Sequence, residues 1–233
     1  MEAVEYKYNN RQENRLNYNS RAATFLLIII CFAVYKRGLE NPELYCSYNN
    51  IFKHGRWWTI FTALFVHGNL MHLLGNMLFL YLFGKGLENH IGPLKLILVF
   101  IVGGAISMLF CCFYYPPDMP CVGASGAICT ILATLMLFNP WKFSLLLNFF
   151  PMPLGVAGFT YLLINIFGFY NDMKHPNHEG LQTAYLGHLM GFVVGIVLGI
   201  VLCPDWKMNL LLSIVQFIAY YLILLLIYYY LIR

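Results

Sequence analysis

Long hydrophobic runs alternate with short polar segments along most of the chain. Runs without Asp, Glu, Lys or Arg cover 22–35, 57–84, 96–117, 119–141, 143–171, 180–204 and 208–232. A helix needs about 20 apolar residues to cross a bilayer, and these runs lack the alternation of a membrane β-barrel. The pattern therefore predicts an all-α, polytopic membrane helix bundle with seven spans.

In two of these runs the expected helix does not coincide with the run itself. The run 22–35 is short, so its helix must extend or cross a thinned bilayer. The run 57–84 starts with two tryptophans, which suit the headgroup region, so we expect its helix to begin near Leu70. Three parts follow: an N-terminal tail (1–21), a six-helix core (22–203) and a seventh transmembrane helix (204–233).

The basic residues suggest an orientation. With the N-terminus in the cytoplasm, eight Lys and Arg residues lie on the inner side and six on the outer side. Positive charge favours the cytoplasmic side, so we expect a multi-pass protein of the cell membrane with a cytoplasmic tail. This orientation places the loops 115–124 and 171–180 together on the outer side.

The composition supports the membrane assignment. Hydrophobic residues make up 60% of the chain and charged residues 10%, whereas soluble domains carry about 25% charged residues. A net charge of +4 is too small to favour a nucleic-acid partner. The seven cysteines form no CxxC pair, and we expect them to be buried as small hydrophobic residues.

Carboxylates are missing from the middle of every predicted span. An intramembrane carboxylate usually marks a proton or ion path, so a proton-coupled carrier and an aspartyl protease are disfavoured. The chain has no His-Glu-x-x-His sequence, which leaves a zinc metalloprotease unsupported. We expect neither a metal nor a cofactor.

A candidate nucleophile lies in Gly123-Ala124-Ser125-Gly126, at the start of the fourth span. Free backbone N–H groups and the helix dipole favour an oxyanion at such a position. The flanking glycines would let a substrate backbone approach the hydroxyl. Taken alone, the sequence is equally typical of a helix start that packs closely.

His188 is the candidate base for Ser125. Glycines at 187, 191, 195 and 199 form a ridge that allows a neighbouring helix to approach closely, and the start of the fourth span is its natural partner. With the sixth span starting near Gly180, His188 lies about 12 Å from the helix start. Because no carboxylate is available, the pair would act as a Ser–His dyad. A polar contact between helices is the alternative.

His72 and Asn76 are four residues apart and share one helix face. Both can donate a hydrogen bond to a developing oxyanion, with the Ser125 N–H as a third donor. A polar contact between helices is again the alternative. A metal site at His67 and His72 is less favoured because no Cys or carboxylate accompanies them.

Together these features resemble the rhomboid family of intramembrane serine proteases over about residues 22–203. The resemblance lies in His67, His72-Leu73-Leu74-Gly75-Asn76, Gly84 with Glu88, Gly123-Ala124-Ser125-Gly126, and His188-Leu189-Met190-Gly191. It implies Ser125 as the nucleophile, His188 as the base, and an oxyanion hole of His72, Asn76 and the Ser125 N–H. His67, Gly123, Gly126 and Gly191 would have structural roles, and the final span would be the extra helix of a six-plus-one arrangement.

Two positions depart from the family pattern. The family often has Trp-Arg after the first span, whereas this chain has Trp58-Thr59 with Arg56 nearby. Many members carry an aromatic residue four positions after the serine, where this chain has Cys129. We therefore expect His188 to be held less firmly than in those members.

The resemblance implies cleavage of single-span membrane proteins through an acyl-enzyme, in a water-filled cavity below the outer surface. Its partners would be these substrates and the lipid bilayer. The alternative is a catalytically silent rhomboid-like protein that binds or escorts membrane clients. A small-solute transporter is disfavoured because the spans lack charged residues.

Overall fold

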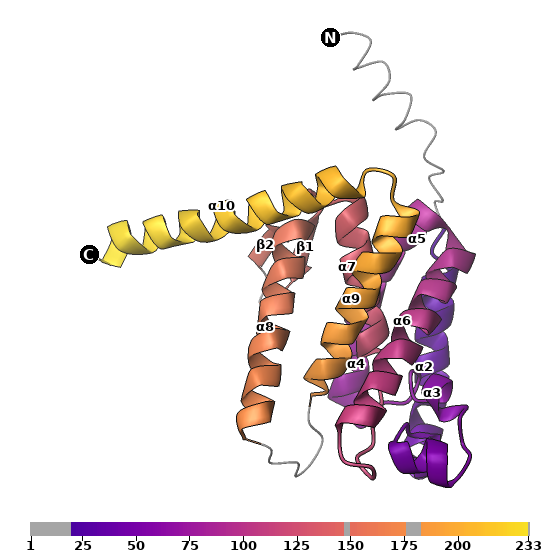
Figure 1. Cartoon of the computed structure of the whole chain (residues 1–233). Coiled ribbons are helices and arrows are strands. Elements are labelled where there is room, and N and C mark those ends of the chain that lie inside the picture. Colours follow the sequence, from indigo (N-terminus) through magenta and orange to yellow (C-terminus); the bar gives the residue numbers. More distant parts are fainter. Residues whose placement is uncertain (1–19, 147–149, 176–182, 233) are drawn as a thin grey trace.

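The protein is a bundle of helices, shown in a computed structural model that describes residues 20–146, 150–175 and 183–232 (Figure 1). Its long helices are α2 (Ala22–Glu40), α6 (Pro93–Tyr114), α7 (Ser125–Phe138), α8 (Leu154–Lys174), α9 (Tyr185–Leu202) and α10 (Trp206–Ile232). Between α2 and α6 lie η1 (Pro42–Leu44), η2 (Asn49–Lys53), α3 (Thr59–Thr62), α4 (Leu70–Phe79), η3 (Leu80–Gly84) and α5 (Lys85–Ile91). The predicted all-α membrane bundle is confirmed.

Six helical segments among the described residues are long and apolar enough to cross a bilayer. One of them is the continuous stretch from α4 through α5, which starts at Leu70 as expected. The run predicted as the fourth span contains only the 14-residue α7. Most of the N-terminal tail (1–21) lies outside the described residues.

Two predicted spans begin later than expected. The first part of the run 143–171 forms a hairpin of β1 (Phe143–Leu146) and β2 (Phe150–Pro153), and helix α8 begins directly after Pro153. Proline disfavours helical backbone at the residue before it, which explains this delay. Helix α9 begins at Tyr185. His188 is therefore in the first turn of α9, about 4.5 Å from its start, and the expected 12 Å was wrong.

Helix α7 forms the centre of the bundle. Every residue from Gly126 to Phe138 is buried, and α7 packs most extensively against α9 and α6. A Cβ atom at Gly191 would overlap the carbonyl oxygen of Gly126, and one at Gly195 would overlap that of Thr130. The predicted glycine-lined contact between these two spans is confirmed.

Threonine hydroxyls lock the register of this contact. The Thr130 hydroxyl donates to the Gly191 carbonyl oxygen at 2.9 Å, and the Thr134 hydroxyl donates to that of Gly195 at 3.0 Å. Lipid offers no replacement for such bonds, so they oppose sliding between the helices. The relative positions of the starts of α7 and α9 are thereby fixed.

A buried carboxylate caps the N-terminus of α2. Glu88 in α5 is fully buried, and its oxygens accept the backbone N–H groups of Ala23 and Thr24, each at 3.0 Å. The hydroxyls of Thr24 and Ser20 donate to it at 2.7 and 3.0 Å. A negative charge is favourable at a helix N-terminus, so Glu88 connects α2 to the rest of the bundle.

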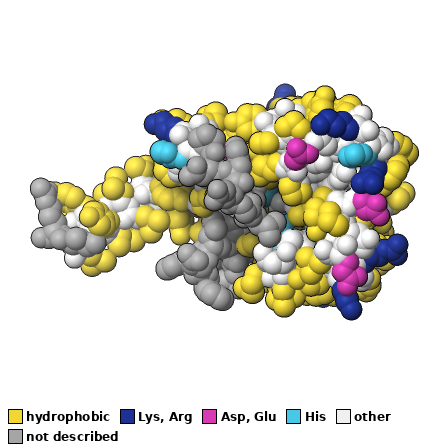
Figure 2. Space-filling model, turned by 90° about the horizontal axis from the view of Figure 1, so that it is seen from below, with side chains coloured by type: hydrophobic (Ala, Val, Ile, Leu, Met, Phe, Trp, Pro, Cys, Tyr) yellow, Lys and Arg dark blue, Asp and Glu magenta, His cyan; other side chains and the backbone are white. Residues whose placement is uncertain are grey.

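Helix α10 runs across the end of the bundle rather than alongside the other helices (Figure 1). It contacts α8, where the hydroxyls of Thr160 and Tyr221 lie 2.9 Å apart. Seen from the end where α7 and α9 begin, charged side chains lie mostly away from α10, whose visible surface is largely hydrophobic (Figure 2). Its length and hydropathy fit a membrane span, and the assignment of 204–233 as a seventh transmembrane helix stays a prediction.

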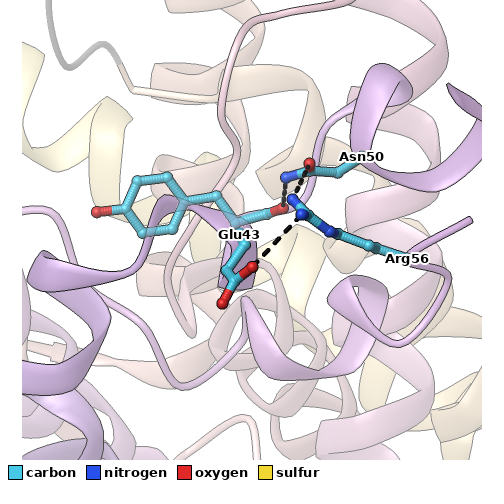
Figure 3. A network of polar contacts seen from close by, with 4 residues as sticks. Glu43, Asn50 and Arg56 are labelled. Atoms are coloured by element: carbon cyan, nitrogen blue, oxygen red, sulfur yellow. Dashed lines mark hydrogen bonds and ion pairs between the residues drawn. The ribbon is translucent and has the colours of Figure 1, made fainter. Parts of the chain in front are cut away.

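The loop after α2 is held by Arg56. Its guanidinium lies 3.4 Å from the Glu43 carboxylate and donates to the Asn50 side-chain oxygen at 3.3 Å (Figure 3). The Thr59 hydroxyl donates to the Arg56 carbonyl oxygen at 2.7 Å. Arg56 thus supplies some of the polar contacts of this loop, beside others such as the bond from the Asn50 amide to the Tyr45 carbonyl oxygen, in a chain that lacks the Trp-Arg pair.

Candidate active site

Ser125 is the first residue of α7 and is partly exposed, whereas the rest of this helix is buried. Gly123 turns the chain into the helix with a φ of +114°, a value that favours glycine. Its N–H donates to the Ala63 carbonyl oxygen at 2.9 Å. The expected position of Ser125 at a helix N-terminus is what the structure shows.

Ser125 and His188 line the same small cavity, together with residues of α6 and of the loop before α7. Its volume of about 20 Å³ is enough for a single water molecule. The hydrogen bonds among the described residues do not include one between the Ser125 hydroxyl and the His188 imidazole. Sites without substrate often hold such pairs loosely, and here both residues line one cavity.

The His188 ring is held from the other side by α8. Its Nδ1 lies 2.7 Å from the side-chain oxygen of Asn165, and the Tyr161 hydroxyl lies 3.5 Å away. An amide oxygen can only accept, so Nδ1 carries the proton in this contact. The second ring nitrogen, Nε2, is then left with a free lone pair, as a general base requires.

An aromatic ring also lies beside His188. The Tyr161 ring is 6.1 Å from the imidazole, at an interplanar angle of 36°. The Cys129 thiol, at the position often aromatic in the family, lies 3.7 Å from the Tyr161 hydroxyl. Helix α8 thus supplies contacts to His188 that the residue at position 129 does not make, and whether the ring is held less firmly than in members with an aromatic residue there stays a prediction.

His72 and Asn76 converge on the backbone before the serine. A Cβ atom at Gly123 would lie 2.9 Å from His72 Nε2 and 3.7 Å from Asn76 Nδ2. Asn69 caps α4 and accepts the backbone N–H of His72 at 2.8 Å. Asn76 uses one N–H on the His72 carbonyl oxygen, at 3.0 Å. Its second N–H remains available as a donor.

His67 is fully buried and supports the same segment. Its Nδ1 lies 3.2 Å from the Phe65 carbonyl oxygen, and its Nε2 accepts the backbone N–H of Ala124 at 3.5 Å. Burial and the nearby His72 lower the pKa of His67 to about 4, so the ring is neutral. Its contacts are those of a structural residue next to Ser125.

The structure brings the predicted site residues to one region between α4, α7 and α9. Sequence reasoning missed Tyr161 and Asn165, which contact His188 from α8. The sequence offers one sign of Asn165, which is an amide side chain in the middle of an apolar run, four residues after Tyr161. Within the described ranges, no group of three or more His, Cys, Asp or Glu side chains is arranged to hold a metal ion.

Comparison with known proteins identifies the family. The Rhomboid domain profile matches residues 54–205. The chain is 35% identical over 82 residues to the putative rhomboid protease YdcA of Bacillus subtilis, which covers 35% of this chain and 41% of the relative. It is 29% identical over 140 residues to the chloroplastic Rhomboid-like protein 11 of Arabidopsis thaliana, covering 57% and 48%. The match spans less than half the length of each of these two relatives.

A third relative is covered more fully. The chain is 24% identical over 176 residues to the rhomboid protease GlpG of Haemophilus influenzae, which covers 73% of this chain and 85% of that protein. The domain match includes both the segment of His72 and Asn76 and the helices of Ser125 and His188. Because it extends over well over half of the sequence, the chain belongs to the rhomboid family.

Proposed function

We propose that this protein is an intramembrane serine protease that cleaves transmembrane protein substrates with Ser125 and His188. The observation that carries the proposal is the shared cavity of these two side chains, with His188 Nδ1 occupied and Nε2 free. Membership of a family in which several relatives are named proteases supports it. No cofactor is needed for this chemistry.

The proposed reaction gives each of these groups one role. Ser125 Oγ attacks the scissile carbonyl while His188 Nε2 takes the hydroxyl proton. The oxyanion forms near the start of α7, where His72 Nε2, the free N–H of Asn76 and the Ser125 backbone N–H can donate to it. His188 then passes its proton to the leaving amine, which completes the acyl-enzyme.

Hydrolysis of the acyl-enzyme needs water below the membrane surface. The cavity between Ser125 and His188 has room for one water molecule. His188 can remove a proton from this water as it attacks the ester, and Ser125 is regenerated. Polar groups at this depth are not solvated by lipid, so water must reach the site from the face on which α7 and α9 begin.

The proposed setting is a cell membrane with the N-terminus in the cytoplasm. The loop after α2 and the segment before Ser125 then lie on the outer side, and the substrates are single-span proteins that enter from the bilayer. The slight excess of basic residues on the tail side supports this orientation. Reactivity of a cysteine placed in the loop after α2 toward an impermeant maleimide would test it.

Cleavage in liposomes tests the catalytic assignment. The wild-type protein, Ser125→Ala and His188→Ala are compared on a single-span model substrate and with a fluorophosphonate probe. Both variants are expected to lose cleavage and labelling. Cleavage by Ser125→Ala at the wild-type rate would refute the mechanism. Substrate binding by a wild-type protein that neither cleaves nor reacts with the probe would favour a catalytically silent, client-binding protein.

A further inference from the structure

Asn165 makes the shortest polar contact of His188. The two side chains lie on different helices, and the Asn165 oxygen is 2.7 Å from His188 Nδ1. Both side chains are buried, with 3% of Asn165 and 9% of His188 exposed. We propose that Asn165 is a positioning residue for the base, which turns the Ser–His pair into a Ser125–His188–Asn165 unit. This inference rests on the proposed function.

The orientation of the Asn165 amide is itself fixed. Its Nδ2 donates to the Tyr161 carbonyl oxygen, one helical turn earlier, at 2.8 Å. The amide nitrogen is thus used within α8, and the oxygen is left to face His188. The proton on His188 then stays on Nδ1, and Nε2 is held toward the cavity that Ser125 lines.

A neutral acceptor suits this location. A carboxylate in the same place would be a buried charge facing an imidazole that is neutral for most of the reaction, and burying a charge is costly. An amide fixes the tautomer and the direction of the ring without that cost. The absence of carboxylates from the middle of the predicted spans is consistent with an orienting residue that is not an acid.

The test compares acceptors at position 165. Asn165→Leu keeps the size of the side chain and removes the acceptor, whereas Asn165→Asp keeps an acceptor in nearly the same place. We expect Asn165→Leu to lower kcat by about 100- to 1000-fold with little change in KM, because a wrong tautomer removes the base. Asn165→Asp should retain at least ten times the activity of Asn165→Leu. Asn171→Leu, the same change at an exposed position of α8, is the matched control.

A spectroscopic readout separates positioning from stability. In ¹⁵N spectra of protein labelled at histidine, His188 should show the Nδ1–H tautomer in the wild type and a mixture in Asn165→Leu. Equal kcat and an unchanged tautomer in Asn165→Leu would overturn the proposal. If Asn165→Leu fails to fold, inactivity of a folded Asn165→Asp would overturn it. Inactive wild-type protein with an intact Nδ1–H tautomer would instead contradict the proposed function.

A second, independent observation concerns four of the seven cysteines. Cys46, Cys111, Cys112 and Cys121 are all buried where the loop after α2, the end of α6 and the segment before Ser125 meet. The sulfur atoms of Cys46 and Cys112 are 3.1 Å apart, and Cys111 and Cys121 line one cavity. Backbone hydrogen bonds of 3.1 and 2.7 Å also join Cys46 and Cys121. The expected burial is confirmed, but these four cysteines also form a cluster.

We propose that this cluster is an oxidation site that forms one disulfide, Cys46–Cys112. It forms by exchange with the disulfide of a dithiol oxidoreductase. Two thiols lose two protons and two electrons to form one S–S bond, and the disulfide of the oxidant becomes two thiols. Adjacent residues of a helix point in different directions, so Cys112 faces Cys46 whereas Cys111 faces the cavity of Ser125 and His188.

The bond would fix a wall of the proposed active site. Cys111, next to Cys112 in the chain, lines the cavity of Ser125 and His188, as does Cys121, which precedes Ser125 by four residues. Cys46 would join the loop after α2 to the end of α6. An oxidising environment is where such bonds persist, so their presence would also place this end of the bundle outside the cytosol.

Thiol counting tests this pairing. Protein in nanodiscs is treated with an oxidised dithiol oxidoreductase, denatured, and alkylated with a maleimide that adds mass. Five reactive thiols are expected before reduction and seven after it. Cys112→Ser should abolish the bond and free Cys46, and Cys31→Ser, a change at a buried cysteine outside the cluster, should leave the bond intact. Seven reactive thiols after oxidation, or a Cys46–Cys121 bond by mass spectrometry, would overturn the proposal.

Discussion

A methyl group added at Gly126 tests how closely α7 must pack for Ser125 to act. Gly126 follows Ser125 and faces α6, where a Cβ atom would lie 2.6 Å from the Ser107 Cβ and 2.7 Å from its hydroxyl oxygen. Carbon atoms in contact are normally about 3.5 to 4.0 Å apart. The variant Gly126→Ala therefore forces the start of α7 away from α6 by about 1 Å.

This displacement gives the expected size of the effect. A misplacement of about 1 Å can cost about 100-fold in rate, because the reacting atoms lose their alignment. Forcing an extra methyl group into a packed core destabilises a protein by about 1 to 3 kcal/mol. We thus expect Gly126→Ala to remain folded, with both cleavage and fluorophosphonate labelling slowed by about 100-fold.

Liposome cleavage, probe labelling and thermal unfolding are measured together. Gly75→Ala is the matched control, because a Cβ atom at Gly75 meets nothing within 4 Å. The double variant Gly126→Ala with Ser107→Gly removes the obstructing side chain and should recover most of the rate. A folded Gly126→Ala protein that cleaves as fast as Gly75→Ala would refute the idea that contact with α6 sets the position of Ser125.

Four further predictions concern single contacts. Asn76→Ala should slow cleavage by about 100- to 1000-fold without lowering the melting temperature, because it removes one oxyanion donor; equal rates would exclude Asn76 from the oxyanion hole. Glu88→Ala should lower stability by about 2 to 4 kcal/mol in thermal unfolding, since the N-terminus of α2 loses its cap; an unchanged melting temperature would contradict this. Thr134→Val should cost about 1 kcal/mol through its bond to Gly195, measured in the same way. The pKa of His67 is lowered from 6.5 to about 4, so the unfolded chain binds this proton first as the pH falls. Stability should then be full above pH 6.5 and fall by up to about 3 kcal/mol toward pH 4, and His67→Gln should flatten that dependence.

Much of the fold follows from the sequence because every helix that crosses the lipid needs about 20 apolar residues. Apolar length was enough to find most of the helices, and Leu70 was identified as a helix start because aromatic residues precede it. The beginnings of α8 and α9 were placed too early, since a run without charges contains no sign of where a hairpin or loop gives way to a helix. Pro153 marks the first of these boundaries, because proline disfavours helical backbone at the residue before it.

The site residues that could be predicted are those that lie in a recognisable sequence pattern within a single helix. Ser125 at a glycine-rich helix start and His188 on a glycine ridge could be paired because close approach leaves few alternatives. The contact of His188 with Asn165 could not be predicted in this way, because it depends on how α8 is rotated about its axis. The gathering of Cys46 with the cysteines of α6 likewise depends on the path of a loop that has no repeating pattern.

The shortness of α7 has a consequence for the choice of peptide bond. Fourteen residues of helix extend about 21 Å, whereas the hydrocarbon layer is about 30 Å thick. If the far end of α7 lies near the opposite surface, Ser125 is about 9 Å beneath the near one. A client would then be cut only where its chain can unwind at that level. Moving the cleaved sequence toward either end of the substrate's transmembrane segment, with its residues unchanged, should abolish cleavage.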